Sequence, residues 1–450
     1  MDYQEDFMDG LKPASGTVEQ LAAEQQQVIA QQGRAYLDSL FGDSQTMPVR
    51  VRSIEVTNAE RFRASFLESQ LAPLLSPGAM TLAEFLRRTD AAYSSLAKTG
   101  AMEAGHVAIG VAGWGGPAIP VSAVFALTPP KRFYAKTGTN VGNGEGDGYI
   151  QLQWKNVFGG GESVSLDAVS GTKTPASYVA SLAMPLAANP NFWWDTSAYT
   201  HTRKWAQLHG SVETTGITSR VSTRFDGPIN ADVAVDSSWR RLSNHGSTAL
   251  AVLAQSKDSF KTSVIASIRY DTRDSASLPT KGQYVRLAAE HGGGCTKVMA
   301  EAQAARQAGA HVFVATQRAG ILARGGLLDR FFCGGPNDVR AFALHGLGPR
   351  VGNSAVGGDC YLSGGFSLVS RLPKVPKDSN FRLHSFFNYG KLVAGDWRQM
   401  CRAYSSSMGI GLLYNHPLAR FELNFVLPLT ACASDSTRKG LQYGVGVSFL

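Results

Sequence analysis

The chain has 450 residues, of which 44% are hydrophobic and 48 are glycine, and its formal net charge is +8. No stretch approaches the ~18 consecutive apolar residues of a conventional membrane-spanning helix, so that class of membrane protein is excluded. A basic chain can bind nucleic acid, anionic lipid or another polar partner. The sequence has no run of five Lys or Arg residues and no interleaving of basic with aromatic residues. We therefore expect no nucleic-acid partner.

The scattered cysteines and the absence of short catalytic motifs argue against an enzyme. The five cysteines are scattered and form no CxxC pair, so we expect free thiols and neither a disulfide framework nor a structural metal site. The glycine-rich stretch NVGNGEGDG is not followed by GK[ST], and the chain has no HExxH and no GxSxG motif. These motifs mark a phosphate-binding loop, a zinc-protease site and the nucleophile elbow of a hydrolase, respectively. We expect no catalytic residues, no cofactor and no metal.

The chain begins with a polar segment, residues 1–45. Its Gln-rich part fits an amphipathic helix from about Val18 to Leu40, ended by Gly42, and equally a flexible arm with helical tendency. The first ten residues, MDYQEDFMDG, are acidic and contain neither a basic nor an apolar region. We expect neither a secretory signal nor an Arg-rich presequence.

Residues 46–128 have the pattern of a compact α/β unit. The stretch VRVRSIEV reads as a strand whose apolar phase slips between Val51 and Ile54, which predicts a β-bulge. Asn58 is placed as the N-cap of a following helix and Thr81 as the N-cap of a second helix, which stops at Gly100. Two more strands are expected near 107–112 and 121–127, so the order is strand, helix, helix, strand, strand.

From residue 129 to 450 the chain reads as strand after strand. In RFELNFVLPL, apolar residues from Phe421 to Leu427 share one face, while Arg420, Glu422 and Asn424 share the other. Charges on the buried face of a soluble sandwich would be costly, whereas a barrel with lipid outside and water inside accommodates both faces. The pattern predicts a transmembrane β-barrel of about sixteen antiparallel strands. We place them near 131–142, 148–158, 162–172, 176–187, 191–202, 214–225, 229–242, 258–271, 283–292, 297–306, 310–322, 358–372, 380–392, 405–415, 418–430 and 439–450.

The segment 297–306, KVMAEAQAAR, has helical propensity, but Lys297, Glu301 and Gln303 alternate with small apolar residues, so we place it as a strand. Connections after even-numbered strands are mostly short, and several after odd-numbered strands are long, as in transmembrane barrels. The final strand has Leu441 and Tyr443 on one face. A strand at a free end needs a partner, and closure of the barrel pairs it with strand one.

Several stretches resemble one family. Asp329–Arg350, DRFFCGGPNDVRAFALHGLGPR, resembles the signature loop of the POTRA-barrel insertases, the superfamily that includes bacterial BamA and the plastid Toc barrels. Tyr270–Leu287 resembles the same family's turn-and-strand motif, and residues 48–128 look like a single POTRA domain. Lys136–Glu162, the stretch GGDCYLSGGFSLVSRLP and the end of the chain are most similar to the barrel subunits of the mitochondrial sorting and assembly machinery (SAM).

The resemblance implies a β-barrel of the mitochondrial outer membrane with its POTRA domain in the intermembrane space. Such a protein folds and inserts β-barrel precursors, including porin and import-pore clients, and has two peripheral SAM subunits on the cytosolic face. The alternative function is a protein-conducting or solute pore of the outer membrane or plastid envelope. A porin would lack the POTRA unit and the loop, and a Toc-type barrel typically carries several POTRA units. A soluble β-rich binding protein is disfavoured by the lipid-type faces.

The resemblance also implies that a long loop, residues 323–357, folds into the barrel lumen. Its motif residues are Gly334, Gly335, Val339, Arg340 and Phe342. An arginine in that confined position needs a carboxylate or carbonyl partner, and Asp359 and Glu422 are candidates on the interior face. The family motif reads Val/Ile-Arg-Gly-Phe, whereas this chain has Ala341 in place of the glycine. If that position is left-handed, alanine costs on the order of 1 kcal/mol.

The family opens a lateral gate between its first and last strands. The gate residues expected on strand one are Arg132, Tyr134, Lys136, Gly138 and Asn140. Those expected on strand sixteen are Gln442, Gly444, Gly446, Val447 and Phe449. Mitochondrial β-barrel clients carry a signal of the form polar-x-Gly-x-x-hydrophobic-x-hydrophobic in their last strand, and Gln442, Gly444, Val447 and Phe449 fit it. The glycines are expected to weaken side-chain packing at the seam.

Overall fold

A computed structural model describes residues 42, 44–75, 78–113, 116–142, 145–172, 174–352, 354–372, 375, 379–395, 397–415 and 420–446. The expected arm of residues 1–45 therefore lies almost entirely outside the described residues. The chain divides into two compact units: the smaller comprises the described residues up to 97 and residues 102–129, and the larger comprises residues 98–101 and the described residues from 130 onward. None of the described helices is both long enough and apolar enough to cross a membrane.

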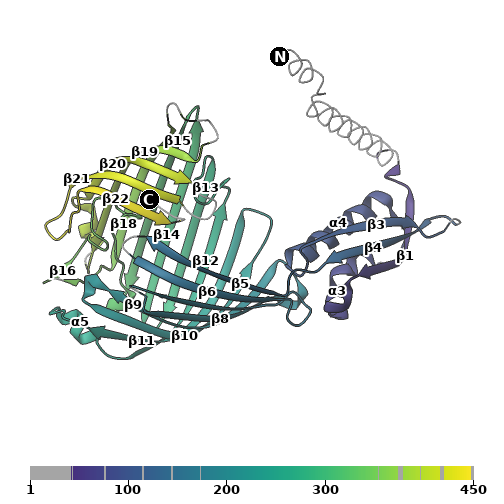
Figure 1. Ribbon diagram of the computed structural model, residues 1–450, viewed down its shortest axis with the longest axis horizontal. Helices are drawn as coiled ribbons and strands as arrows, with labels where there is room; N and C mark the ends of the chain where they lie inside the picture. Colours follow the sequence, from purple (N-terminus) through teal and green to yellow (C-terminus); the bar gives the residue numbers. More distant parts are fainter. Residues whose placement is uncertain are drawn as a thin grey trace, which may run out of the picture. The chain divides into compact units, whose positions relative to one another are not determined.

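The smaller unit is a four-stranded mixed sheet with two helices (Figure 1). Its strand order is β2-β1-β4-β3, with β1 and β4 parallel. Its elements are β1 (Pro48–Thr57), α3 (Ala64–Leu71), β2 (Met80–Thr81), α4 (Leu82–Lys98), β3 (Ala104–Val111) and β4 (Ile119–Thr128), with 3₁₀ helices η1 (Ala59–Arg61) and η2 (Ala72–Leu74). Phe66, Phe85, Leu96 and Phe125 fill the core between helices and sheet.

The local predictions for this unit are confirmed in part. The register of β1 with β4 shifts between Val51 and Ser53, which is the expected bulge. Thr81 Oγ1 accepts a hydrogen bond from Glu84 N at 3.2 Å, and Gly100 has a φ of 66° beyond the end of α4. The role predicted for Asn58 was wrong. Its side chain donates to Leu127 O at 2.9 Å instead of capping a helix, and only the short η1 follows it.

The larger unit is an antiparallel sheet of sixteen strands that runs in order from β5 to β22 (Figure 1). The strands are β5 (Phe133–Gly142), β6 (Glu145–Lys155), β7 (Ser163–Gly171), β8 (Ala176–Pro185), β9 (Phe192–Trp205), β10 (Gly210–Thr223), β11 (Ile229–Asn244), β12 (Ser259–Asp271), β13 (Gly282–Gly292), β14 (Cys295–Ala308), β15 (His311–Ala323), β18 (Cys360–Arg371), β19 (Phe381–Val393), β20 (Ser405–Asn415), β21 (Arg420–Thr430) and β22 (Gly440–Gly446).

The connections of this sheet contain short elements. These are η3 (Leu186–Ala188), η4 (Ala206–Leu208), α5 (Leu250–Gln255), η5 (Leu327–Asp329), the two-residue strands β16 (Arg350–Val351) and β17 (Ser354–Ala355), and η6 (Trp397–Cys401). The barrel strand count and the approximate strand positions predicted from the sequence are confirmed. The segment 297–306 is part of β14 despite its helical propensity, because its neighbours on both sides hold it in the sheet.

The two faces of the wall differ as the alternation predicted. On β21 the side chains of Phe421, Leu423 and Phe425 are exposed, whereas Glu422 and Asn424 are buried. The exposed apolar residues match a lipid-facing surface. The buried polar residues are covered by the connection between β15 and β18, which lies inside the barrel. The apolar core of this unit accordingly sits around that connection, with Val339, Phe342 and Leu347 fully or almost fully buried.

Candidate functional site

The site is built on the connection between β15 and β18, residues 324–359, which we call the inward loop. Gly334 and Gly335 have φ values of 103° and 130°, a region that favours glycine. They turn the chain so that Gly335 N and Val339 O close a short turn at 3.1 Å. The next residue, Arg340, is thereby presented to the wall. The turn thus delivers one guanidinium to the inner face of β19 and β21.

Arg340 is fully buried and joined to Glu422 of β21. Its Nη2 and Nε donate to Glu422 Oε2 at 2.8 and 3.1 Å, and its Nη1 donates to Asn388 Oδ1 at 3.1 Å. The guanidinium also lies 4.5 Å from the ring centroid of Phe386. Of the two carboxylates considered from the sequence, the structure brings Glu422 to Arg340. The planar guanidinium makes these three hydrogen bonds at once. The compact ammonium group of a lysine could not reach both partners in this geometry.

Glu422 gathers further polar partners, so its buried charge is compensated. Asn424 Nδ2 donates to Oε2 at 2.7 Å, and Arg420 forms an ion pair with Oε1. His384 Nδ1 is 3.8 Å from the same oxygen. Isolated buried charges are strongly destabilising, whereas charges with several hydrogen bonds are tolerated. The cluster therefore fixes the inward loop at one position along β19–β21.

The inward loop also holds the last strand and the residues just before it. Ala341 N donates to Gln442 Oε1 at 3.1 Å, and Ala341 O accepts from Arg438 N at 2.8 Å. Ala343 N donates to Ser436 O at 2.9 Å. Gln442 is one of the residues that the sequence assigned to the gate. Its side chain is buried and bonded to the loop, so the loop motif and the final strand form one structural unit.

Ala341 has a φ of 69° and no exposed surface. This is the left-handed region, in which the family glycine is unstrained and alanine is not. The alanine methyl packs with Phe386 and Val426. Burial of the methyl offsets part of the backbone strain.

A second ionic cluster anchors the first part of the inward loop, and the sequence did not predict it. Asp329 Oδ1 accepts from Arg240 Nη1 of β11 at 2.7 Å and from Lys261 Nζ of β12 at 2.9 Å. Lys261 also binds Glu290 at 2.6 Å, and Lys297 Nζ donates to Asp329 O at 3.0 Å. Burial opposes ionisation of Asp329, but the hydrogen bonds from Lys261 and Arg240 outweigh it and lower the pKa of the carboxyl below its usual range.

The two clusters attach the inward loop to different parts of the wall. Asp329 ties it to β11–β14, and Arg340 ties it to β19–β21. Asp359, the second candidate partner of Arg340, pairs instead with Arg330 at 3.3 Å and accepts from Gly395 N at 2.9 Å. The loop is thus bonded to β11, β12 and β14, which precede it in the chain, and to β19 and β21, which follow it.

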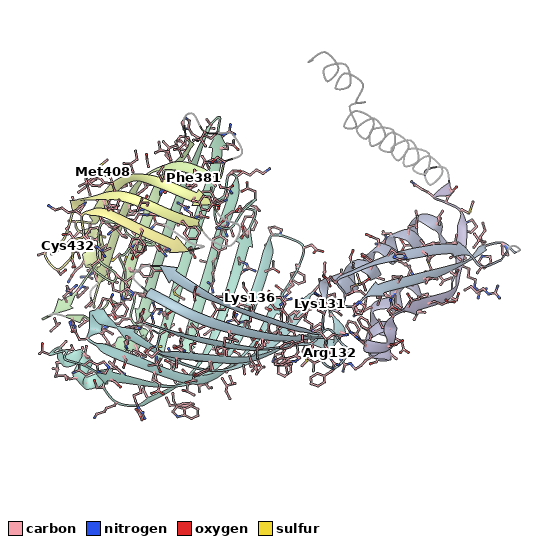
Figure 2. The ribbon with its side chains drawn as sticks, viewed as in Figure 1. Lys131, Arg132, Lys136, Phe381, Met408 and Cys432 are labelled. Atoms are coloured by element: carbon pink, nitrogen blue, oxygen red, sulfur yellow. The ribbon has the colours of Figure 1, made fainter. Side chains whose placement is uncertain are left out.

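The expected gate strands lie at the two ends of the sheet order. Every neighbouring pair within the order has a hydrogen-bonded register. Between β5 and β22 no register and no backbone hydrogen bond is present among the described residues, although their Cα atoms approach within 8 Å. Val447 and Phe449 lie outside the described residues, as does the side chain of Asn140. Figure 2 labels Arg132 and Lys136 at the β5 end of the wall.

Two of the other gate residues expected on the first strand, Arg132 and Lys136, have side-chain partners on β6 or just after it. Arg132 Nη2 donates to Val157 O at 3.4 Å, and Lys136 Nζ lies 5.7 Å from the ring centroid of Tyr149. A Cβ on Gly138 would be 2.7 Å from the hydroxyl of Tyr149, so this ring covers the space that glycine leaves. Tyr134 is about half exposed, at 47%. On β22, Gly444 pairs with Glu422 and Gly446 with Arg420.

Comparison with known proteins identifies the family. A family model described as the Omp85 superfamily domain matches residues 156–449. The sorting assembly machinery 50 kDa subunit of Saccharomyces cerevisiae is 30% identical, over 91% of this chain and 96% of the yeast protein. The chain belongs to the Omp85 superfamily. Within it, the chain is a homologue of the 50 kDa sorting and assembly subunits.

Other relatives agree with this assignment. The human sorting and assembly machinery component 50 homolog is 29% identical over 83% of this chain and 85% of the human protein. The crystal structure of BamA from Haemophilus ducreyi lacking POTRA domains 1–3 has a TM-score of 0.74, with 14% identity, over 88% of this chain and 84% of the BamA chain. BamA thus shares the fold. This Omp85 protein is a non-enzymatic β-barrel assembly protein of the mitochondrial outer membrane.

Proposed function

We propose that this Omp85 protein inserts β-barrel precursors into the outer membrane through a lateral gate between β5 and β22. The observation that carries the proposal is the missing register. Within the described residues, these are the two ends of the sheet order, and no hydrogen bond joins them. A seam whose described part has no ladder of backbone hydrogen bonds costs little to open along that part. The free edges then offer backbone donors and acceptors to another strand.

The physical need for such a gate comes from the membrane. Unpaired backbone groups are costly in lipid, so a half-folded barrel cannot wait in the bilayer with open edges. The edge of β5 pairs with a client's last strand by β-augmentation. Later hairpins of the client add one at a time, and the new barrel closes and leaves. No covalent chemistry is required at any step.

The inward loop supports this proposal on the other side of the seam. Gln442 occupies the polar position of the client-type signal and binds Ala341 N. A client strand with a polar residue at the same position offers the same acceptor. The loop is then a template that recognises the signal in either strand. It also occupies part of the lumen, with Arg340 and Phe342 fully buried, and this favours an assembly factor over an open pore.

The partners follow from the proposed function. The clients are β-barrel precursors, including porins and import pores, and the bilayer is the medium in which they are released. We propose that the α/β unit is a POTRA domain facing the intermembrane space. Two peripheral subunits of the sorting and assembly machinery are proposed to sit on the cytosolic face.

A disulfide lock across the seam tests the gate. Single cysteines at positions 134–138 are combined with single cysteines at 441–445 in a chain whose five natural cysteines are replaced by serine or alanine. Assembly of an imported radiolabelled porin is followed in isolated mitochondria with the pair oxidised and reduced. We expect assembly to stop on oxidation and return on reduction. Normal assembly with a quantitatively locked seam would refute the gate.

Two controls make the result specific. A matched cysteine pair between β12 and β13, whose register runs without a break from Ser263 to Asp271, is locked in the same way and is expected to leave assembly unchanged. Single cysteines on β5 are also tested for disulfide formation with a cysteine in the client's last strand. Client crosslinks that depend on import support the gate, and crosslinks distributed equally over β5 and β12 argue against it.

A further inference from the structure

The outer, lipid-facing surface of the barrel has a groove whose lining residues lie outside the two strands of the proposed gate. Its volume is about 950 Å³, and it crosses seven strands from β13 to β21. It lies between two rows of outward side chains that follow the cross-strand register. One row is Ala304, Ala315, Phe366, Phe387, Met408 and Leu427. The other is Arg306, Phe313, Leu368, Ser385, Ile410 and Phe425.

The outward side chains of the two rows are large except for Ser385 and where the first row crosses β14 and β15. Phe313 and Phe366 are 54% and 58% exposed, and Met408, labelled in Figure 2, is 48% exposed. On β14 and β15 the first row is reduced to the methyl groups of Ala304 and Ala315. The floor between the rows includes Gly409, which has no side chain. Apart from Arg306 and Ser385, the side chains of the two rows are aromatic or aliphatic, which suits a hydrocarbon chain.

The groove begins at a rim that carries positive charge. Arg306 lies two residues from the end of β14 at Ala308, next to the turn that leads into β15. Its side chain is exposed and has no ion pair or hydrogen bond with the described residues. Lys281 directly precedes Gly282, whose register partner is Ala305, so the next register position places Lys281 beside Arg306. No Asp or Glu is among the described residues that line the groove.

The groove also rises from this rim towards the middle of the membrane. Ile410 lies five residues inside the end of β20 at Asn415, on the same rim as the end of β14. Five residues at about 3.3 Å each, on strands tilted by about 40°, rise about 13 Å. Half of a bilayer's hydrocarbon core is about 15 Å thick. The groove thus runs from headgroup level to near the centre of the bilayer.

We propose that this groove binds one anionic phospholipid of the leaflet on the short-turn side. Its phosphate lies at Arg306 and Lys281, and one acyl chain follows the groove past Phe313 and Phe366 towards Ile410. The charge selects the headgroup, because a cation near the surface favours anionic lipid. The small side chains of Ala304 and Ala315 leave room for the acyl chain. Bound lipid fills a depression that would otherwise leave the wall poorly packed against the bilayer.

The test uses the full chain in nanodiscs of phosphatidylcholine that contain a small fraction of phosphatidylglycerol with a photoreactive diazirine in its acyl chain. After illumination, the labelled peptides are identified by mass spectrometry. We expect adducts concentrated on the peptides that contain Phe313–Ala315 and Phe366–Leu368. Arg306→Glu reverses the charge and is expected to reduce them at least about fivefold, the effect of losing one surface cation, whereas Arg306→Lys retains most of them.

Two further variants separate headgroup from chain. Ala315→Trp fills the groove at β15 and is expected to abolish the adducts without changing any charge. Lys204→Glu changes the net charge equally at an exposed position on β9 near the opposite rim and is expected to have no effect. Heat-dependent gel mobility verifies that each variant is folded. Adducts distributed evenly around the wall, equal labelling by a diazirine phosphatidylcholine, or undiminished labelling of Arg306→Glu would overturn the proposal.

Discussion

At the scale of single residues, Arg340 is the centre of the site because all three of its guanidinium nitrogens donate hydrogen bonds. Both Nε and Nη2 reach Glu422, and Nη1 reaches Asn388. The arginine and its carboxylate come from positions 82 residues apart in the chain. Removal of either one leaves the charge of the other less compensated in a buried position, so the two side chains stabilise the barrel chiefly as a pair.

A double-mutant cycle measures this dependence. Arg340→Ala is expected to lower the free energy of unfolding of the barrel by about 3–5 kcal/mol, as does loss of one partner from other buried pairs. Glu422→Gln is expected to be destabilising as well, and the double variant is expected to cost less than the sum. The midpoint of heat-dependent gel mobility measures all three. Additive effects would mean that the ion pair contributes nothing of its own.

Ala341 gives a second prediction at this scale. Ala341→Gly relieves about 1 kcal/mol of left-handed strain and removes a buried methyl worth about 0.8 kcal/mol. The two effects nearly cancel, so the unfolding midpoint is expected to stay close to that of the natural chain. Ala341→Val adds a β-branched side chain at a φ of 69° and is expected to cost about 1–3 kcal/mol. A stable valine variant would contradict the left-handed backbone.

At the scale of elements, the inward loop is attached to the wall by two ionic clusters. Asp329 holds its first part to β11 and β12, and Arg340 holds its second part to β21. Between them, apolar side chains such as Phe331 and Phe342 are buried against the wall. Loss of one anchor is therefore expected to loosen only the adjoining part of the loop.

Asp329→Asn tests the first anchor. The variant removes the charge that Lys261 and Arg240 share and is expected to cost about 2 kcal/mol, the usual value for hydrogen bonds to charged groups. Glu290→Gln is the matched control, because Glu290 binds the same lysine but belongs to β13 and not to the loop. Trypsin cleavage at Arg324 and Arg330 reports loop release. We expect faster cleavage in Asp329→Asn than in Glu290→Gln, and equal rates would contradict the anchor.

The same anchor predicts a pH dependence. Because the pKa of Asp329 is lowered in the folded state, its ionisation stabilises the fold above the unfolded carboxyl pKa of about 3.9 and this contribution is lost as pH falls through the folded pKa. The difference in unfolding midpoint between the natural chain and Asp329→Asn is therefore expected to be constant near neutral pH. It should shrink below about pH 4. A difference that persists undiminished in acid would show that the charge is not responsible.

At the scale of the whole molecule, the sequence predicted the barrel well because alternation along a strand is local. Residues such as Phe421 and Glu422 report the two faces directly. The ionic anchors were harder to predict. Asp329 meets Arg240 and Lys261 across 89 and 68 residues, and no spacing rule connects them. Asn58 was misassigned because a side chain that caps a helix can equally bind a distant carbonyl, here that of Leu127.

Each of the two units has its own buried core, and this predicts independent unfolding. Phe85 is fully buried in the smaller unit, so Phe85→Ala is expected to destabilise that unit by about 3–5 kcal/mol. Phe386 is buried in the barrel, and Phe386→Ala is the reciprocal variant. Urea unfolding followed by brief proteolysis reports the smaller unit, and heat-dependent gel mobility reports the barrel. Each variant is expected to change one readout and leave the other within error. If Phe85→Ala also lowers the barrel's midpoint, the two cores unfold together and the units are not separate.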